Sequence, residues 1–228
     1  MIHTWLSATV DALTPLADPA RALLMAAYMK DVSDFLGVPT PDRRRALATA
    51  WKPLSPLDEQ SLAAVCAELW ELPEREYQYS ACDLIATRSR TLSAAFVPDV
   101  AQNLMTTKPW WDTVDSLGSA AVTPLVERHR LVELMWSWLD SGDRWLVRAA
   151  IQHQRGLEER TDLDRLLGMC DRVAAEREFF IAKAVGWALR DTTAFAPAEV
   201  QSFVDDHPRL SPVARREALR GLARSARP

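Results

Sequence analysis

The chain has 228 residues, of which 48% are hydrophobic, and a formal net charge of −4 at pH 7. This length suits one domain or a compact array of repeats with a buried core, and the acidic charge argues against a protein that coats DNA through a generally basic surface. The three cysteines form no Cys-x-x-Cys pair and the four histidines are scattered, so we expect no disulfide framework and no metal site. We also expect no signal peptide, no membrane contact and a cytoplasmic location, nucleoid-associated in a bacterium.

Helix signals recur at short intervals along the chain. Glycine is scarce, at seven residues, and the abundance of Ala, Leu, Arg and Glu favours helix throughout. A capping residue followed by proline predicts a helix over 18–35, with Gly37 as its stop. Further helices are predicted over 43–51 and 58–72. Pro, Gly and Asp punctuation continues at Pro98, Pro109, Pro124, Ser141-Gly142-Asp143, Thr161, Pro197 and Ser211-Pro212.

The sequence contains an internal repeat. Segments starting at Arg75, Trp110, Arg144 and Phe179, with a weaker copy at Val213, can be stacked in register. One repeat position then holds Ser80, Asp115, Arg148, Lys183 and Arg216, at successive steps of 35, 33, 35 and 33 residues. This period predicts an all-α solenoid of helix pairs forming a single domain over 1–228. The polar row fits a binding groove and, equally well, a ladder that braces neighbouring repeats.

Basic residues gather at the end of the chain. Residues 209–228 contain six arginines and a single acid, Glu217, so this segment has a formal net charge of +5. A local basic face can bind phosphate on an acidic protein, because salt screens the field within about 8–10 Å. The simpler interpretation is a solvated helix end.

The segment 110–115 (WWDTVD) carries the most unusual chemistry. On a helix, Trp111 and Asp115 are four residues apart and share a face. An electron-rich ring beside a carboxylate suits a cationic ligand or a cation-like transition state. A core tryptophan with a capping aspartate is the simpler alternative. Trp187 lies four residues after Lys183, and Arg148 follows Trp145, so comparable pairs recur in the later repeats.

At this point the sequence resembles the AlkD-like DNA alkylation-repair family over about residues 21–222. The resemblance rests on ordered segments at compatible spacing: 27–30 (AYMK), 35–44 (FLGVPTPDRR), 69–78 (LWELPEREYQ), 107–115 (TKPWWDTVD), 145–151 (WLVRAAI), 178–190 (EFFIAKAVGWALR), 210–212 (LSP) and 216–218 (REA). It implies HEAT-like helix pairs in a C-shaped superhelical solenoid, with double-stranded DNA in the concave face. It further implies excision of N3- and N7-alkylated purines by cleavage of the N-glycosidic bond, without base flipping.

The resemblance assigns candidate roles to single residues. Trp111, Asp115, Arg148 and Trp187 match the family's functional positions, with Asp115 facing the sugar cation and Arg148 a backbone phosphate. Further DNA contacts are expected from Tyr28, Lys30, Lys183, Arg190, Arg215 and Arg216. No metal or organic cofactor is expected, and an open shape suggests a monomer.

Two other functions compete with this prediction. A HEAT-repeat protein could bind DNA structure without excising bases, but the matching Asp115 and Arg148 argue against a pure binder. A protein-interaction scaffold would expose an apolar concave face, whereas the repeat row is polar and mostly basic.

Overall fold

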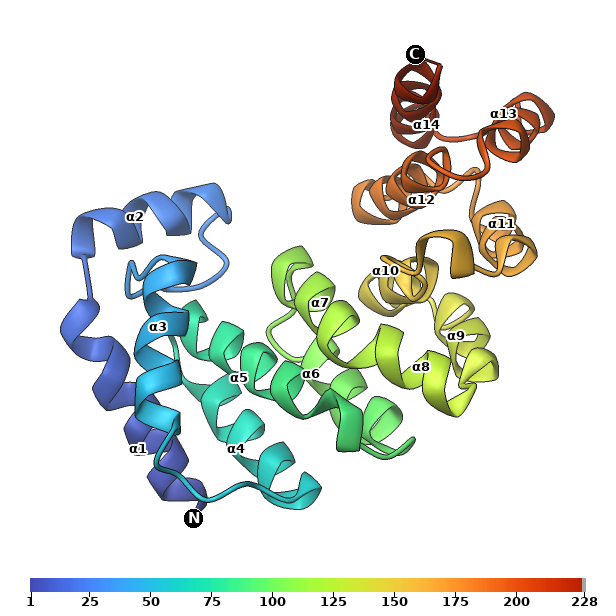
Figure 1. Ribbon diagram of the computed structural model, residues 1–228. Coiled ribbons are helices and arrows are strands. Elements are labelled where there is room, and N and C mark those ends of the chain that lie inside the picture. Colours follow the sequence, from blue (N-terminus) through green and yellow to red (C-terminus); the bar gives the residue numbers. More distant parts are fainter. Residues whose placement is uncertain (227–228) are drawn as a thin grey trace. The chain divides into compact units, whose positions relative to one another are not determined.

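A computed structural model describes residues 1–226 of the chain (Figure 1). These residues form helices, turns and loops without an extended strand, apart from an isolated bridge between Asp34 and Glu74. The predicted all-α class is therefore confirmed, while the C-shaped course of the repeats stays a prediction. None of the described helices is long and apolar enough to cross a membrane. The chain divides into two compact units, unit 1 (Met1–Leu125) and unit 2 (Val126–Pro228).

Unit 1 consists mainly of helices joined by short loops. They are α1 (Ile2–Leu13), α2 (Pro19–Tyr28), α3 (Thr40–Trp51), α4 (Glu59–Glu71), α5 (Arg75–Arg88), α6 (Gln102–Thr106) and α7 (Trp111–Leu117). Short 3-10 turns lie at Thr14–Leu16 and Ser89–Thr91, and π-helical turns at Val97–Ala101 and Gly118–Val122. The second π turn joins α7 to α8 (Thr123–His129), which crosses the boundary between the units.

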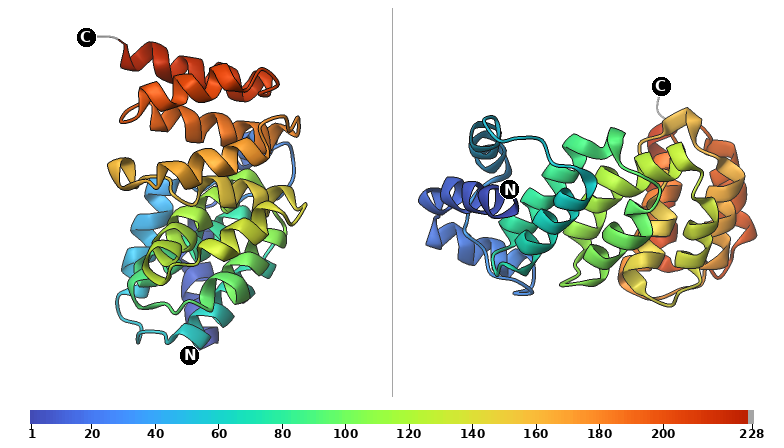
Figure 2. Two further views of the ribbon diagram at one scale, coloured as in Figure 1. Left: turned by 90° about the vertical axis from the view of Figure 1, so that its right-hand side faces the viewer. Right: turned by 90° about the horizontal axis from the view of Figure 1, so that it is seen from below.

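Unit 2 repeats the alternation of helix and short connection. Its helices are α9 (Val132–Leu139), α10 (Arg144–Gln152), α11 (Leu163–Arg172), α12 (Phe179–Thr192), α13 (Pro197–Asp206) and α14 (Pro212–Ser225), with a 3-10 turn at Glu158–Arg160. In Figure 2 these helices follow one another in successive rows from yellow to red. Within the unit, α12 packs on α10 and, most extensively, on α14.

Capping side chains explain where many helices begin. Asp58 accepts the backbone N–H of Ser61 at 2.7 Å, and Asp143 accepts that of Trp145 at 2.8 Å. Asp18, Asp162, Glu178 and Ser211 cap α2, α11, α12 and α14 in the same way. Each bond satisfies a backbone donor that the first helical turn leaves unpaired. These starts are local properties of the sequence and were predicted from it at Asp18 and Asp58, while Ser211-Pro212 was predicted only as a break between elements.

The second helix is shorter than predicted. It ends at Tyr28 rather than near residue 35, because Lys30 and Asp31 adopt left-handed φ angles of 63° and 56°. Their backbone N–H groups bond back to the carbonyls of Ala27 and Ala26 and close the last turn. Gly37, predicted as the helix stop, instead lies in the following loop with φ +87°.

The members of the predicted repeat row all lie on helices, but they differ in exposure. Ser80 on α5 and Arg148 on α10 are buried, Asp115 on α7 and Lys183 on α12 are half-buried, and Arg216 on α14 is exposed. Arg148 donates to the carbonyl of Phe180 at 2.9 Å and so reaches the next helix pair. Arg148 therefore braces two neighbouring helices, as the ladder alternative expects.

Candidate functional site

Trp111 and Asp115 lie on one helix of unit 1 and both are half-buried. Trp111 is the first residue of α7, and the loop before it contains Lys108 in a left-handed conformation with φ 49°. The Lys108 ammonium donates to the carbonyls of Trp70 and Glu71, at 2.9 and 2.8 Å, where α4 ends. A cation at a helix C-terminus is a favourable pairing. Lys108 therefore ties the start of α7 to the end of α4.

The neighbouring carboxylate, Asp112, belongs to a buried network rather than to an open site. Arg75, 1% exposed, donates to both of its oxygens, at 3.1 and 2.6 Å. Tyr79 adds a hydrogen bond from its hydroxyl to Asp112, and burial together with that carboxylate raises the pKa of Tyr79 well above its usual range. Of the two carboxylates in the segment, Asp112 is thus engaged in holding α7, and the role of Asp115 stays a prediction.

Tyr28 lies against Trp111 within unit 1. Their ring centres are 6.5 Å apart and the planes meet at 76°, an edge-to-face contact. The Tyr28 side chain is 71% exposed, and Lys30 follows it in an exposed turn. Two residues predicted as separate contacts, Tyr28 and Trp111, thus form one aromatic surface.

Helix α7 ends at Leu117, two residues after Asp115, and a turn with a different hydrogen-bond pattern follows. The N–H of Gly118 bonds to the carbonyls of Asp115 and Val114, and a π-helical turn follows over Gly118–Val122. Ser119 donates its hydroxyl to the same Asp115 carbonyl at 3.2 Å. Single π turns inside helices are frequent at functional sites. This turn was not predicted, since no side-chain periodicity marks it.

Four cations surround Trp187 in unit 2. The guanidinium of Arg148 lies 5.0 Å from its ring centre, those of Arg155 and Arg190 at 5.6 and 5.7 Å, and the Lys183 ammonium at 5.6 Å. Cations at such distances are attracted by the face of the ring. We call these five residues the Trp187 cluster. Arg155 was not predicted, although it stands three residues after Gln152 in the turn that ends α10.

A buried carboxylate organises this cluster from the neighbouring helix. Glu217 of α14, 2% exposed, accepts from Lys183 at 2.7 Å and from Arg190 at 3.0 Å. The hydrogen bond from Lys183 is the largest cause that lowers the pKa of Glu217, which keeps it ionised. Arg190 also pairs with Asp191 at 3.1 Å. Lys183 and Arg190 of the cluster are therefore held by carboxylates.

The predicted basic segment near the C-terminus divides into different roles. Arg215 donates to the carbonyls of Val204 and His207, at 3.2 and 2.6 Å, at the end of α13. Arg216 is exposed on α14, and Arg227 lies outside the described residues. Arg215 therefore braces the end of α13, and its DNA contact stays a prediction.

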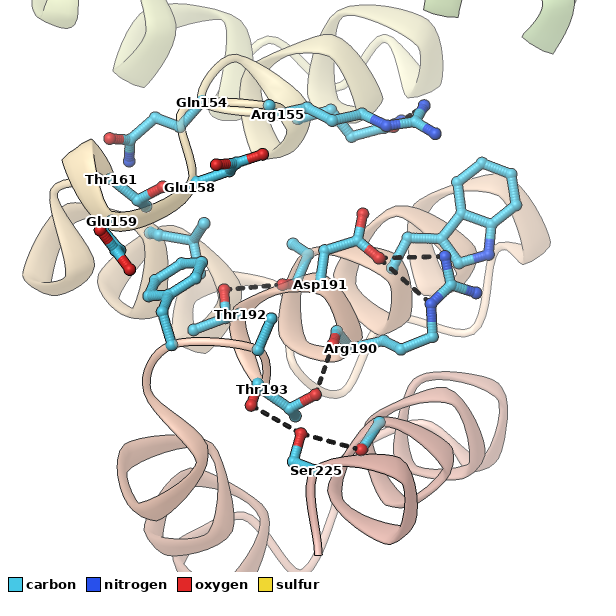
Figure 3. A pocket seen from close by; sticks show the side chains of 18 of the residues that line it. Gln154, Arg155, Glu158, Glu159, Thr161, Arg190, Asp191, Thr192, Thr193 and Ser225 are labelled. Atoms are coloured by element: carbon cyan, nitrogen blue, oxygen red, sulfur yellow. Dashed lines mark hydrogen bonds and ion pairs between the residues drawn. The ribbon is translucent and has the colours of Figure 1, made fainter. Parts of the chain in front are cut away.

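A cavity of about 590 Å³ lies in unit 2 beside the Trp187 cluster (Figure 3). Arg155, Trp187 and Arg190 form part of its wall, together with Phe195. The hydroxyls of Thr192, Thr193 and Ser225 line it but donate to backbone carbonyls, as the dashed lines show for the last two. Among residues 1–226, no group of three or more His, Cys, Asp or Glu side chains could hold a metal ion.

The fold and these clusters define an all-α protein, with an aromatic–carboxylate surface in one unit and an aromatic–cation cluster in the other. A family model described as "DNA alkylation repair enzyme" matches residues 9–222, and the chain belongs to that family. Its structure is similar to a solved structure described as a predicted DNA alkylation repair enzyme from Enterococcus faecalis. The two chains are 30% identical, the TM-score is 0.79, and the match covers 91% of this chain and 97% of the other. No protein with a curated description matches the chain.

Proposed function

We propose that this protein is a DNA glycosylase that removes N3- and N7-alkylated purines from duplex DNA. The observation that carries the proposal is the surface formed by Tyr28, Trp111 and Asp115 in a member of the alkylation repair family. The opposite assignment, with Asp112 as the chemical group, is disfavoured because that carboxylate is enclosed by Arg75 and Tyr79.

The proposed chemistry follows from the charge of the lesion. Alkylation at N3 or N7 makes the purine cationic, so the base leaves with the electron pair of the bond to C1′ and becomes neutral. The sugar is left as an oxocarbenium-like cation. The Asp115 carboxylate stabilises this charge and takes the proton of the water whose oxygen bonds to C1′. The ring of Trp111 adds a cation–π attraction of about 0.5–2 kcal/mol.

The Trp187 cluster suits a backbone phosphate. Three guanidinium groups and one ammonium group gather around this ring, and Arg and Lys are the side chains that most often contact backbone phosphates. We assign Arg148, Lys183 and Arg190 to this contact, with the guanidinium groups suited to the planar geometry of a phosphate. Tyr28, Lys30 and Arg216 are proposed as further DNA contacts, and the lesion is proposed to stay stacked in the duplex.

The test is release of 7-methylguanine from methylated duplex DNA by the wild type and by Asp115→Asn. We expect the variant to lose about 10²–10³-fold in single-turnover rate while it still binds DNA. Asp164→Asn is the matched control, since Asp164 is an exposed aspartate of α11 in the other unit. No release by the wild type together with salt-sensitive DNA binding would leave a non-catalytic DNA-structure binder, and the absence of both would leave a protein scaffold.

A further inference from the structure

The segment Glu74–Tyr79 has no part in the proposed chemistry, yet it buries polar side chains at the start of α5. Arg75 is 1% exposed, and Glu76 and Gln78 are fully buried. Ionised groups are removed from water in this way only where hydrogen bonds compensate the loss of hydration. The partners of Arg75 and Glu76 therefore show what these side chains hold in place.

Arg75 holds the start of α7. Besides its two bonds to Asp112, it donates to the carbonyl of Lys108 at 2.8 Å and to the hydroxyl of Thr113 at 2.9 Å. These acceptors stand on both sides of Trp111 along the chain. Arg75 therefore fixes the loop before Trp111 and the first turn that follows it.

Glu76 holds the loop that supports α2. Its carboxylate accepts the backbone N–H groups of Leu36, Gly37 and Val38, at 2.9, 2.9 and 3.0 Å. The Leu36 carbonyl in turn accepts the N–H of Asp18, which caps α2, at 2.8 Å. A side chain on Gly37 would place its Cβ 2.2 Å from the Asp18 carbonyl oxygen, so the loop and the helix start are in direct contact.

The consecutive side chains of Arg75 and Glu76 thus hold α7 and α2 in place, and these are the two helices that meet at Trp111 and Tyr28. We propose that Arg75 and Glu76 are positioning residues for the candidate active site: Arg75 sets α7 with Trp111 and Asp115, and Glu76 sets α2 with Tyr28. This inference rests on the proposed function. Neither residue touches the DNA in it: Arg75 acts through Asp112, Thr113 and the Lys108 carbonyl, and Glu76 acts through the backbone of residues 36–38.

The first experiment combines Glu76→Gln with Tyr28→Ala in a double-mutant cycle, read as the single-turnover rate of 7-methylguanine release. Glu76→Gln replaces one acceptor oxygen by a donor that faces backbone N–H groups, and we expect a rate loss of about tenfold from misplacement. If Glu76 acts through Tyr28, the double variant loses no more than the larger single effect. Additive losses, or an unchanged rate in Glu76→Gln, would overturn the proposal.

The matched control is Glu59→Gln. Glu59 also holds a loop by accepting a backbone N–H, from Ser93 at 2.6 Å, together with the hydroxyl of the same residue at 2.7 Å. It lies in the same unit but holds no element of the candidate site, so we expect an unchanged release rate. A second variant, Gly37→Ala, acts at the other end of the Glu76 connection and leaves the buried carboxylate in place. We expect it to reproduce the rate loss, even if Glu76→Gln folds poorly.

A readout without catalysis separates failure of this inference from failure of the proposed function. The indole N–H resonance of Trp111, assigned with Trp111→Phe, should shift in Gly37→Ala and Glu76→Gln but not in Glu59→Gln. A shift without any base release by the wild type would support the positioning role and sink the glycosylase. Base release by the wild type with an unmoved resonance in both variants would sink the positioning role alone.

Discussion

Glu217 and Lys183 form an ion pair of 2.7 Å between α14 and α12, and Glu217 is 2% exposed. The same carboxylate binds Arg190 at 3.0 Å, so a single buried acid orders two cations of the Trp187 cluster. We predict that Glu217→Gln lowers the free energy of unfolding by about 1–3 kcal/mol, since the hydrogen bonds from Lys183, Arg190 and Arg220 lose their charged acceptor. Urea denaturation measures this difference. A variant as stable as the wild type would show that the pairs contribute nothing.

The pH dependence of stability should report on His153. Burial lowers the pKa of His153 to about 4, and its Nε2 has no hydrogen-bond partner. In the unfolded chain the same ring titrates at about 6.5. Between these two values only the unfolded state binds the proton, so stability rises with pH across this window and falls on acidification. The expected change is about 3 kcal/mol between pH 6.5 and 4.

The variant His153→Gln isolates this contribution. It removes the titrating ring and keeps a donor for the Ala150 carbonyl, which His153 Nδ1 contacts at 2.6 Å. The difference in unfolding free energy between wild type and variant should therefore change with pH within the window and be constant above it. A difference that stays constant from pH 4 to 7 would rule out a neutral, buried His153.

Close packing between α12 and α14 depends on a glycine. A Cβ on Gly186 would lie 2.9 Å from the Glu217 Cβ and 3.0 Å from the Ala214 Cα. We predict that Gly186→Ala costs about 1–3 kcal/mol in stability because the helices must move apart. Gly168→Ala in α11 is the control: its Cβ would lie 3.6 Å from Trp136, an ordinary contact. That control should be neutral or stabilising by about 0.4–1 kcal/mol.

Arg155 offers a test of phosphate binding that leaves the buried network intact. It is exposed, and its guanidinium lies 5.6 Å from the Trp187 ring centre. If it neutralises one phosphate, Arg155→Ala reduces the slope of log binding constant against log salt by about 0.9. Arg160→Ala, which breaks an exposed pair with Glu127, serves as the control and should leave the slope unchanged. Equal slopes for wild type and Arg155→Ala would remove Arg155 from the DNA contact.

The sequence by itself determined the helical class and the helix starts at Asp18 and Asp58. Caps such as Asp58 and Ser211 act on backbone groups within three residues, so the local pattern contains all that decides them. The repeat period likewise placed Asp115, Arg148 and Lys183 at equivalent helical positions from their spacing alone. A resemblance in ordered motifs then indicated the family, which the comparisons confirm.

Only the tertiary structure decided which charged residues brace the fold. Asp112 and Asp115 look equivalent along the chain, but Arg75, 37 residues from Asp112, engages Asp112 in a buried ion pair. The roles of Arg215 and Glu217 likewise follow from partners on other helices. Arg215 binds a carbonyl at the end of α13, and Glu217 binds Lys183 of α12. Ionic interactions and desolvation depend on what packs around a group in space, and this cannot be read from its neighbours in sequence.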